Sequence, residues 1–108
     1  LNRAHEMIAL RKNVQLRQRR EALYRSREKI IKALSCIHRS YEFCKREAKR
    51  EDRQTQIPID IMVQSRLKSL EDKKKTELEK LARVDAEIAE IESQMEALEV
   101  SWVMDRES

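Results

Sequence analysis

This sequence has no glycine, one proline and few aromatic residues. Glycine normally supplies the tight turns of compact sheet proteins, so its absence argues against a sandwich, a barrel or a doubly wound sheet. It also excludes the glycine-rich loops that hold nucleotide phosphates. Charged residues instead make up 41% of the chain, as is typical of long helices and coiled coils. The composition therefore predicts an all-α protein.

Long apolar runs and paired cysteines are missing as well. No stretch of 18 apolar residues occurs, so we expect no membrane partner. Cys36 and Cys44 lie too far apart on one helix to form a disulfide, and two free thiols fit a reducing compartment. The chain begins with Leu1 and shows no targeting signal, so we expect it to be a piece excised from a larger protein.

The single proline divides the chain into two helical segments. Pro58 is tolerated in the first turn of a helix but not in its interior, so it predicts a helix start. We expect helix 1 over residues 1 to about 53, a turn at about 54–57, and helix 2 from 58 to about 104. The whole of 1–108 would then form a single coiled-coil domain.

Apolar residues repeat with heptad spacing in both segments, which is typical of a coiled-coil seam. The repeat is nearly faultless between Leu81 and Leu98, while Lys74 and Glu77 fall inside the seam as polar faults. The predicted seam residues are Leu16, Leu23, Ile30, Leu34, Ile37, Tyr41, Cys44, Leu67, Leu70, Leu81, Val84, Ile88, Ile91, Met95, Leu98 and Trp102.

Two arginines at core positions of helix 1 favour an antiparallel hairpin. In a parallel homodimer, Arg20 and Arg27 would each face their own copy, whereas in a hairpin they face Ile91 and Val84. The preferred register pairs Leu23 with Ile88 and Ile30 with Leu81, and it places Asn13 against Leu98. A slip of one heptad also keeps apolar layers together, so it stays open as the second choice.

The distribution of charge supports the same fold. Residues 1–56 contain 16 basic and 7 acidic side chains, and residues 57–108 contain 8 basic and 13 acidic ones. Two halves of opposite charge attract each other when they lie side by side. We therefore expect two long helices in an antiparallel coiled-coil hairpin, with both termini at one end.

No set of residues indicates an enzyme. His5 and His38 lie far apart, and neither belongs to a catalytic triad pattern. His38, Tyr41 and Cys44 share one helical face, but seam packing and a charge pair explain them better than a metal site does. We expect no catalytic residues, no metal, no cofactor and no small-molecule substrate.

The outer face of helix 1 carries an unusual number of basic residues. At the heptad position directed away from helix 2, six of seven residues are basic and none is acidic. Such a stripe is either an ordinary solvated face or a track that attracts a polyanion. The stripe and its edges consist of Arg11, Gln18, Arg25, Lys29, Lys32, Arg39, Arg46, Lys49, Arg50 and Arg53.

With its seam of Leu81, Val84, Ile88, Ile91, Met95 and Leu98 and its stripe of Arg25, Lys32, Arg39 and Arg46, the chain resembles a family of microtubule-binding coiled coils. Specifically, it is similar to the microtubule-binding region of the unconventional kinetochore of kinetoplastids. The resemblance spans the chain and rests on pattern. It implies microtubules as partner and a place at the kinetochore or spindle in the nucleus, or on the cytoplasmic cytoskeleton.

Two other functions stay open. One is a structural spacer or assembly module of a cytoskeletal or chromosomal complex. Apolar residues outside the seam favour contact with a flanking segment or a second copy near Val100, Trp102, Val103 and Met104. The other is a nucleic-acid-binding arm, because the predicted hairpin also resembles the N-terminal arm of seryl-tRNA synthetases.

Overall fold

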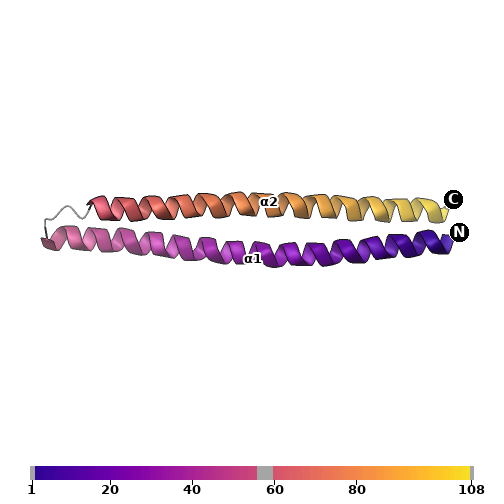
Figure 1. Ribbon diagram of the computed structural model, residues 1–108, viewed down its shortest axis with the longest axis horizontal. Coiled ribbons are helices and arrows are strands. Elements are labelled where there is room, and N and C mark those ends of the chain that lie inside the picture. The colour runs from indigo at the N-terminus through magenta and orange to yellow at the C-terminus, as the bar shows by residue number, and fades with distance from the viewer. Residues whose placement is uncertain (1, 56–59, 108) are drawn as a thin grey trace. The chain divides into compact units, whose positions relative to one another are not determined.

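The computed structural model describes the backbone of residues 2–55 and 60–107 and the side chains of residues 3–49 and 62–101. Two helices make up the described backbone: α1 is Asn2–Thr55 and α2 is Asp60–Glu107 (Figure 1). No strand occurs within these ranges. The predicted fold, an all-α antiparallel helical hairpin, is confirmed.

Both helices extend further than the sequence indicated. α1 continues through Gln54 and Thr55, which were expected in the turn, and α2 continues past residue 104 to Glu107. None of these residues breaks a helix, and no glycine marks a stop, so the helices continue. α2 is described from Asp60, and the expected start at Pro58 lies outside the described residues.

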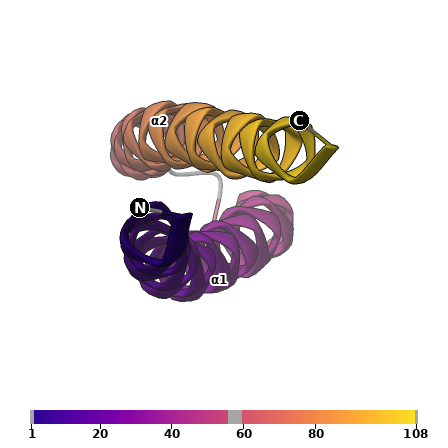
Figure 2. The ribbon, with the colours of Figure 1, turned by 90° about the vertical axis from the view of Figure 1, so that its right-hand side faces the viewer.

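The chain divides into two units, each made from a part of both helices. Unit 1 consists of Leu1–Glu28 and Ala82–Ser108, and unit 2 is the continuous stretch Lys29–Leu81. In unit 1 the indigo start of α1 lies beside the yellow end of α2, as Figures 1 and 2 both show. Unit 1 thus holds the first described residues of the chain together with the last ones.

The core of unit 1 follows the predicted seam. Ile88 and Ile91 are its most buried side chains, with 7% and 3% of their surface exposed. Around them, the seam positions of both helices are half-buried. These half-buried residues are Leu16, Arg20, Leu23 and Arg27 on α1, and Val84, Met95 and Leu98 on α2. Trp102, also predicted in the seam, lies outside the described side chains.

Unit 2 has the same construction, with one departure. Ile30 and Cys44 are buried, and the other predicted apolar seam positions are half-buried: Leu34, Ile37, Tyr41, Leu67, Leu70 and Leu81. Lys74, which the heptad pattern placed inside the seam, is exposed instead. A lysine has a long flexible stem, so its ammonium group reaches water from a seam position. Glu77 stays half-buried, and its carboxylate binds the Lys80 ammonium at 3.2 Å.

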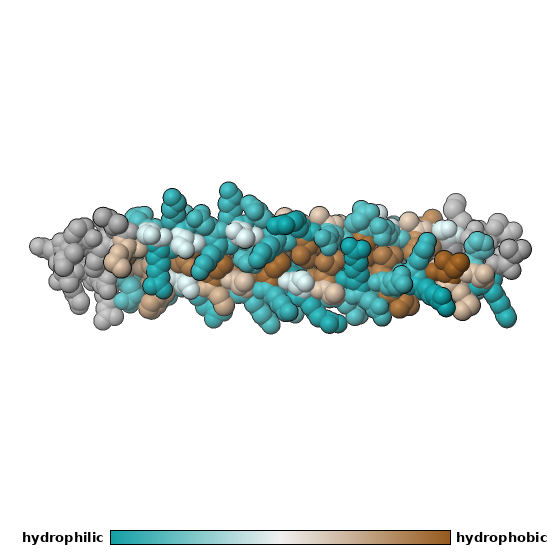
Figure 3. Space-filling view, viewed as in Figure 1, coloured by the Kyte–Doolittle hydropathy of each residue, from teal (hydrophilic) through white to brown (hydrophobic). Residues whose placement is uncertain are grey.

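A two-helix seam offers only a shallow core. Among the described residues, no side chain is less than 2% exposed. Figure 3 shows hydrophobic side chains gathered along the line between α1 and α2 in each unit, flanked by hydrophilic ones. The apolar stripe is therefore narrow, as expected for a coiled coil rather than for a wider helix bundle.

Contacts in unit 1 indicate the register of the two helices. The Arg27 guanidinium donates from Nε to Asp85 at 2.8 Å, and Asp85 follows Val84, the residue expected opposite Arg27. Leu10 and Arg17 also line one hollow together with Glu92 and Glu99. A slip of one heptad would shift these partners by about 10 Å along the helix. The contacts therefore favour the register that pairs Leu23 with Ile88.

Candidate polyanion-binding face

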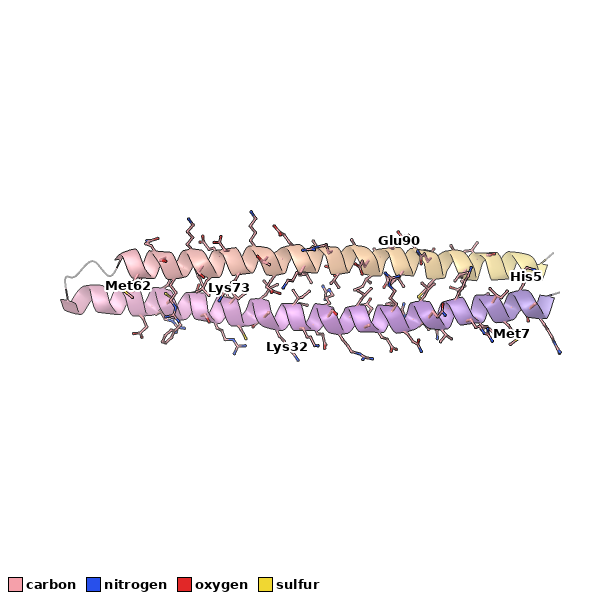
Figure 4. All side chains as sticks on the ribbon, viewed as in Figure 1. His5, Met7, Lys32, Met62, Lys73 and Glu90 are labelled. Carbon is pink, nitrogen blue, oxygen red and sulfur yellow. The ribbon has the colours of Figure 1, made fainter. Side chains whose placement is uncertain are left out.

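The basic side chains of unit 2 lie on the exposed side of α1. Lys29, Lys32, Arg39, Arg46 and Lys49 are all exposed. Figure 4 shows the Lys32 side chain directed away from α2. Lys32, Arg39 and Arg46 repeat every seven residues, so they share one side of the helix at a spacing of about 10 Å. Arg50 and Arg53 lie in α1, but their side chains are outside the described residues.

Unit 1 carries a sparser set of the predicted residues. Arg11, Gln18 and Arg25 are exposed. Arg25 was expected at the heptad position directed away from helix 2. Its guanidinium lies 3.8 Å from the Glu21 carboxylate, one turn earlier on the same helix. Both side chains are at least 70% exposed, so this pair contributes about 0.3–0.5 kcal/mol at most.

Two further contacts in unit 2 involve basic residues of α1, one beside the seam and one on the outer side. The Lys45 ammonium lies 4.7 Å from the centre of the Tyr41 ring, within the range of a cation–π interaction. Arg46 Nε donates to the backbone carbonyl of Glu42 at 3.4 Å. Tyr41 and Lys45 are four residues apart, so their spacing could have predicted this contact. The Lys45 ammonium group is thereby held near the ring of Tyr41, which is a seam residue.

α2 has a less uniform outer surface. Lys73, Lys74 and Lys75 are exposed, and so are the neighbouring acidic residues Glu71 and Asp72. Lys68 and Glu71 line a shallow hollow of unit 2 with Tyr41, Gln64, Ser65 and Leu67. Both signs of charge therefore meet on this helix, whereas the repeating outer position of α1 is basic throughout unit 2.

In unit 1 the sequence did not predict the contact of Tyr24. Its hydroxyl donates to the Glu92 carboxylate at 3.0 Å. The hydrogen bond and, second, the negative charge of Glu92 raise the pKa of Tyr24 above its ordinary value of 10.0. The long phenol side chain of Tyr24 reaches Glu92, although the preferred register does not place these two residues opposite each other.

The cysteines and the neighbouring His38 and Tyr41 differ in exposure. Cys36 and His38 are exposed, Tyr41 is half-buried and Cys44 is buried. Among the described residues, no group of three His, Cys, Asp or Glu side chains could hold a metal ion. Within the described helices, no segment is long and apolar enough to cross a membrane. Of the apolar residues expected to extend the seam surface, Val100 is 52% exposed; Trp102, Val103 and Met104 lie outside the described side chains.

No protein-family model, curated protein or solved structure matches this chain. The fold and the charges of the chain itself therefore define its class, an antiparallel coiled-coil hairpin with exposed cations at the repeating outer position of α1 in unit 2.

Proposed function

We propose that this hairpin is a non-enzymatic module that binds an acidic filament, a microtubule, through the basic side chains on the outer side of α1. The observation that carries the proposal is the set Lys32, Arg39 and Arg46. All three side chains are exposed, all are basic, and they recur at the heptad position farthest from α2. Basic residues at this outer position contribute neither to the seam nor to the pairing of α1 with α2.

The regular spacing suits a repetitive surface better than a small ligand. Several cations about 10 Å apart form many weak contacts, and each gains from the summed field of an acidic polymer. Salt screens exposed charges beyond about 10 Å at 0.1 M. The affinity should therefore be modest and should fall as salt rises. A site at the kinetochore or spindle, or on the cytoplasmic cytoskeleton, follows from the same proposal.

The test is co-sedimentation with microtubules after charge reversal in unit 2. Lys32→Glu, Arg39→Glu and Arg46→Glu together should lower the affinity at least about tenfold, which corresponds to about 1.4 kcal/mol. Helicity and melting temperature should not change, because these side chains are exposed. The matched control reverses three exposed lysines of α2, Lys68, Lys73 and Lys75, and should lower the affinity less.

Competitors distinguish the partner. Duplex DNA and transfer RNA are polyanions too, so both are added to the co-sedimentation assay. The competitor is added at a concentration whose total negative charge equals that of the microtubules. If transfer RNA or DNA then displaces the protein from microtubules, a nucleic-acid-binding arm is the better function. If the triple variant of α1 pellets as the parent does, the basic side is only a solvated face, and a structural spacer becomes the better interpretation.

A further inference from the structure

Unit 1 exposes an apolar row on α1 that lies outside the seam. Met7, Leu10 and Val14 are 58%, 61% and 52% exposed. They are spaced by three and four residues, so they form one continuous row along the helix. Arg3 and Arg17, also exposed, flank the row at the same helical spacing. An apolar row bordered by charge is a frequent form of protein interface.

This row continues into a hollow between α1 and α2 of unit 1. The hollow measures about 440 Å³, and Leu10 and Met95 contribute apolar surface to it. Its α1 wall carries Arg17 and Arg20, and its α2 wall is strongly acidic. The acidic residues are Glu92, Glu96 and Glu99, and all three are exposed.

The two walls have opposite charges, and this complementarity identifies the occupant. A twofold axis brings the same patch of both partners together, and when that axis runs parallel to the helices, each wall of one copy faces the other wall of its partner. The acidic α2 wall of one copy then meets the basic and apolar α1 wall of the other, and the symmetry repeats this contact a second time. We propose that this face of unit 1 is a homodimer interface whose occupant is unit 1 of a second copy.

The interaction differs from microtubule binding in both its place and its chemistry. It uses the apolar row and the walls of the hollow in unit 1, whereas the proposed filament contacts are the outer cations of unit 2. The apolar row contributes three exposed side chains, whereas a stable complex uses roughly 20–30 residues on each partner, so a weak, concentration-dependent dimer is expected. Reversing Lys32, Arg39 and Arg46 to Glu should leave that dimer unchanged.

Charge reversal on either helix of this face, on the acidic wall of α2 or at the arginines that flank the apolar row of α1, separates this dimer from other associations. One variant carries Glu96→Lys and Glu99→Lys, and the other carries Arg3→Glu and Arg17→Glu. In sedimentation equilibrium of the full chain, each variant alone should be monomeric at concentrations where the parent dimerises, because like-charged walls meet. An equimolar mixture should form a heterodimer, because both contacts then join opposite charges.

Two controls complete the test. Glu87→Lys with Glu90→Lys changes the charge of α2 by the same amount at exposed positions outside the hollow, and should leave the dimer intact. Leu10→Ser should keep the melting temperature and raise the dissociation constant of the dimer about tenfold, equal to about 1.4 kcal/mol. A monomeric parent at every concentration, an unchanged constant in Leu10→Ser, or no heterodimer in the mixture of folded variants would overturn the proposal.

Discussion

At the scale of single residues, the heptad pattern places a polar side chain, Asn13, in the seam. Asn13 stays in the seam of unit 1, where its Oδ1 atom is buried without a hydrogen-bond partner among the described residues. Asn13 and Leu98 line the same hollow, in agreement with the register that placed them opposite each other. A buried unpaired acceptor costs about 1–3 kcal/mol. A polar seam residue of this kind can nevertheless select one register over its alternatives.

The raised pKa of Tyr24 gives a prediction at this scale. A group whose pKa is raised in the folded state stabilises the fold fully below its ordinary value, here about 10. This contribution is lost as the pH rises through the higher folded pKa, because the phenolate loses its hydrogen bond and repels Glu92. Glu92→Gln should therefore lower the pKa of Tyr24 toward 10.0 and weaken the loss of stability at alkaline pH.

The measurement is ultraviolet titration of tyrosinate in a Tyr41→Phe background, where Tyr24 is the remaining tyrosine. Glu90→Gln serves as the control, since Figure 4 shows the Glu90 side chain directed away from α1. Identical titration midpoints in the parent and Glu92→Gln would mean that the hydrogen bond does not form in solution.

At the scale of the helices, heptad spacing determines which residues are buried. The predicted seam positions on α2 of unit 1 are those with the lowest exposure, and the positions between them are exposed. A narrow seam cannot compensate for a charge in its centre, because an aspartate is too short to reach water as Lys74 does.

Ile88→Asp should destabilise the hairpin strongly for this reason. Ile88 is 7% exposed, so the substitution removes apolar burial and places a carboxylate in the seam. We expect a loss of about 3 kcal/mol and a melting temperature lower by more than about 10 °C, measured by circular dichroism. Ser93→Asp, at an exposed position of the same helix, is the control and should change it little. Equal losses from both substitutions would contradict the seam assignment.

At the scale of the whole molecule, the hairpin topology was readable from the sequence, but its details were not. Two antiparallel helices were indicated by Arg20 and Arg27 at core positions, by the nearly faultless heptads between Leu81 and Leu98, and by the single proline. The helix ends were misplaced because nothing after Arg53 or Met104 forces a stop. The Arg25–Glu21 and Tyr24–Glu92 contacts were missed because the conformations of exposed side chains, rather than the heptad, decide which partner they reach.

An engineered disulfide tests the topology within unit 2. With Cys36 and Cys44 replaced by alanine, Ile30→Cys and Leu81→Cys should oxidise to a crosslink inside one chain, because the hairpin register pairs these two positions. The product should run as a monomer on a non-reducing gel at every dilution. Crosslinks formed only between chains would show that two chains, rather than two segments of one chain, make the coiled coil.

The division into two units also implies an order of events during folding. In unit 2, Tyr41 and Leu67 line one hollow and lie 26 positions apart in the sequence, whereas the hydrogen bond from Tyr24 to Glu92 in unit 1 joins residues 68 positions apart. Closing a long loop costs more chain entropy than closing a short one, and contacts between distant residues form late. We therefore expect pairing to start in unit 2, where each turn that closes shortens the loop that unit 1 must still close. Damage to the seam of unit 2 would consequently slow the folding of unit 1, although the two units bury different residues.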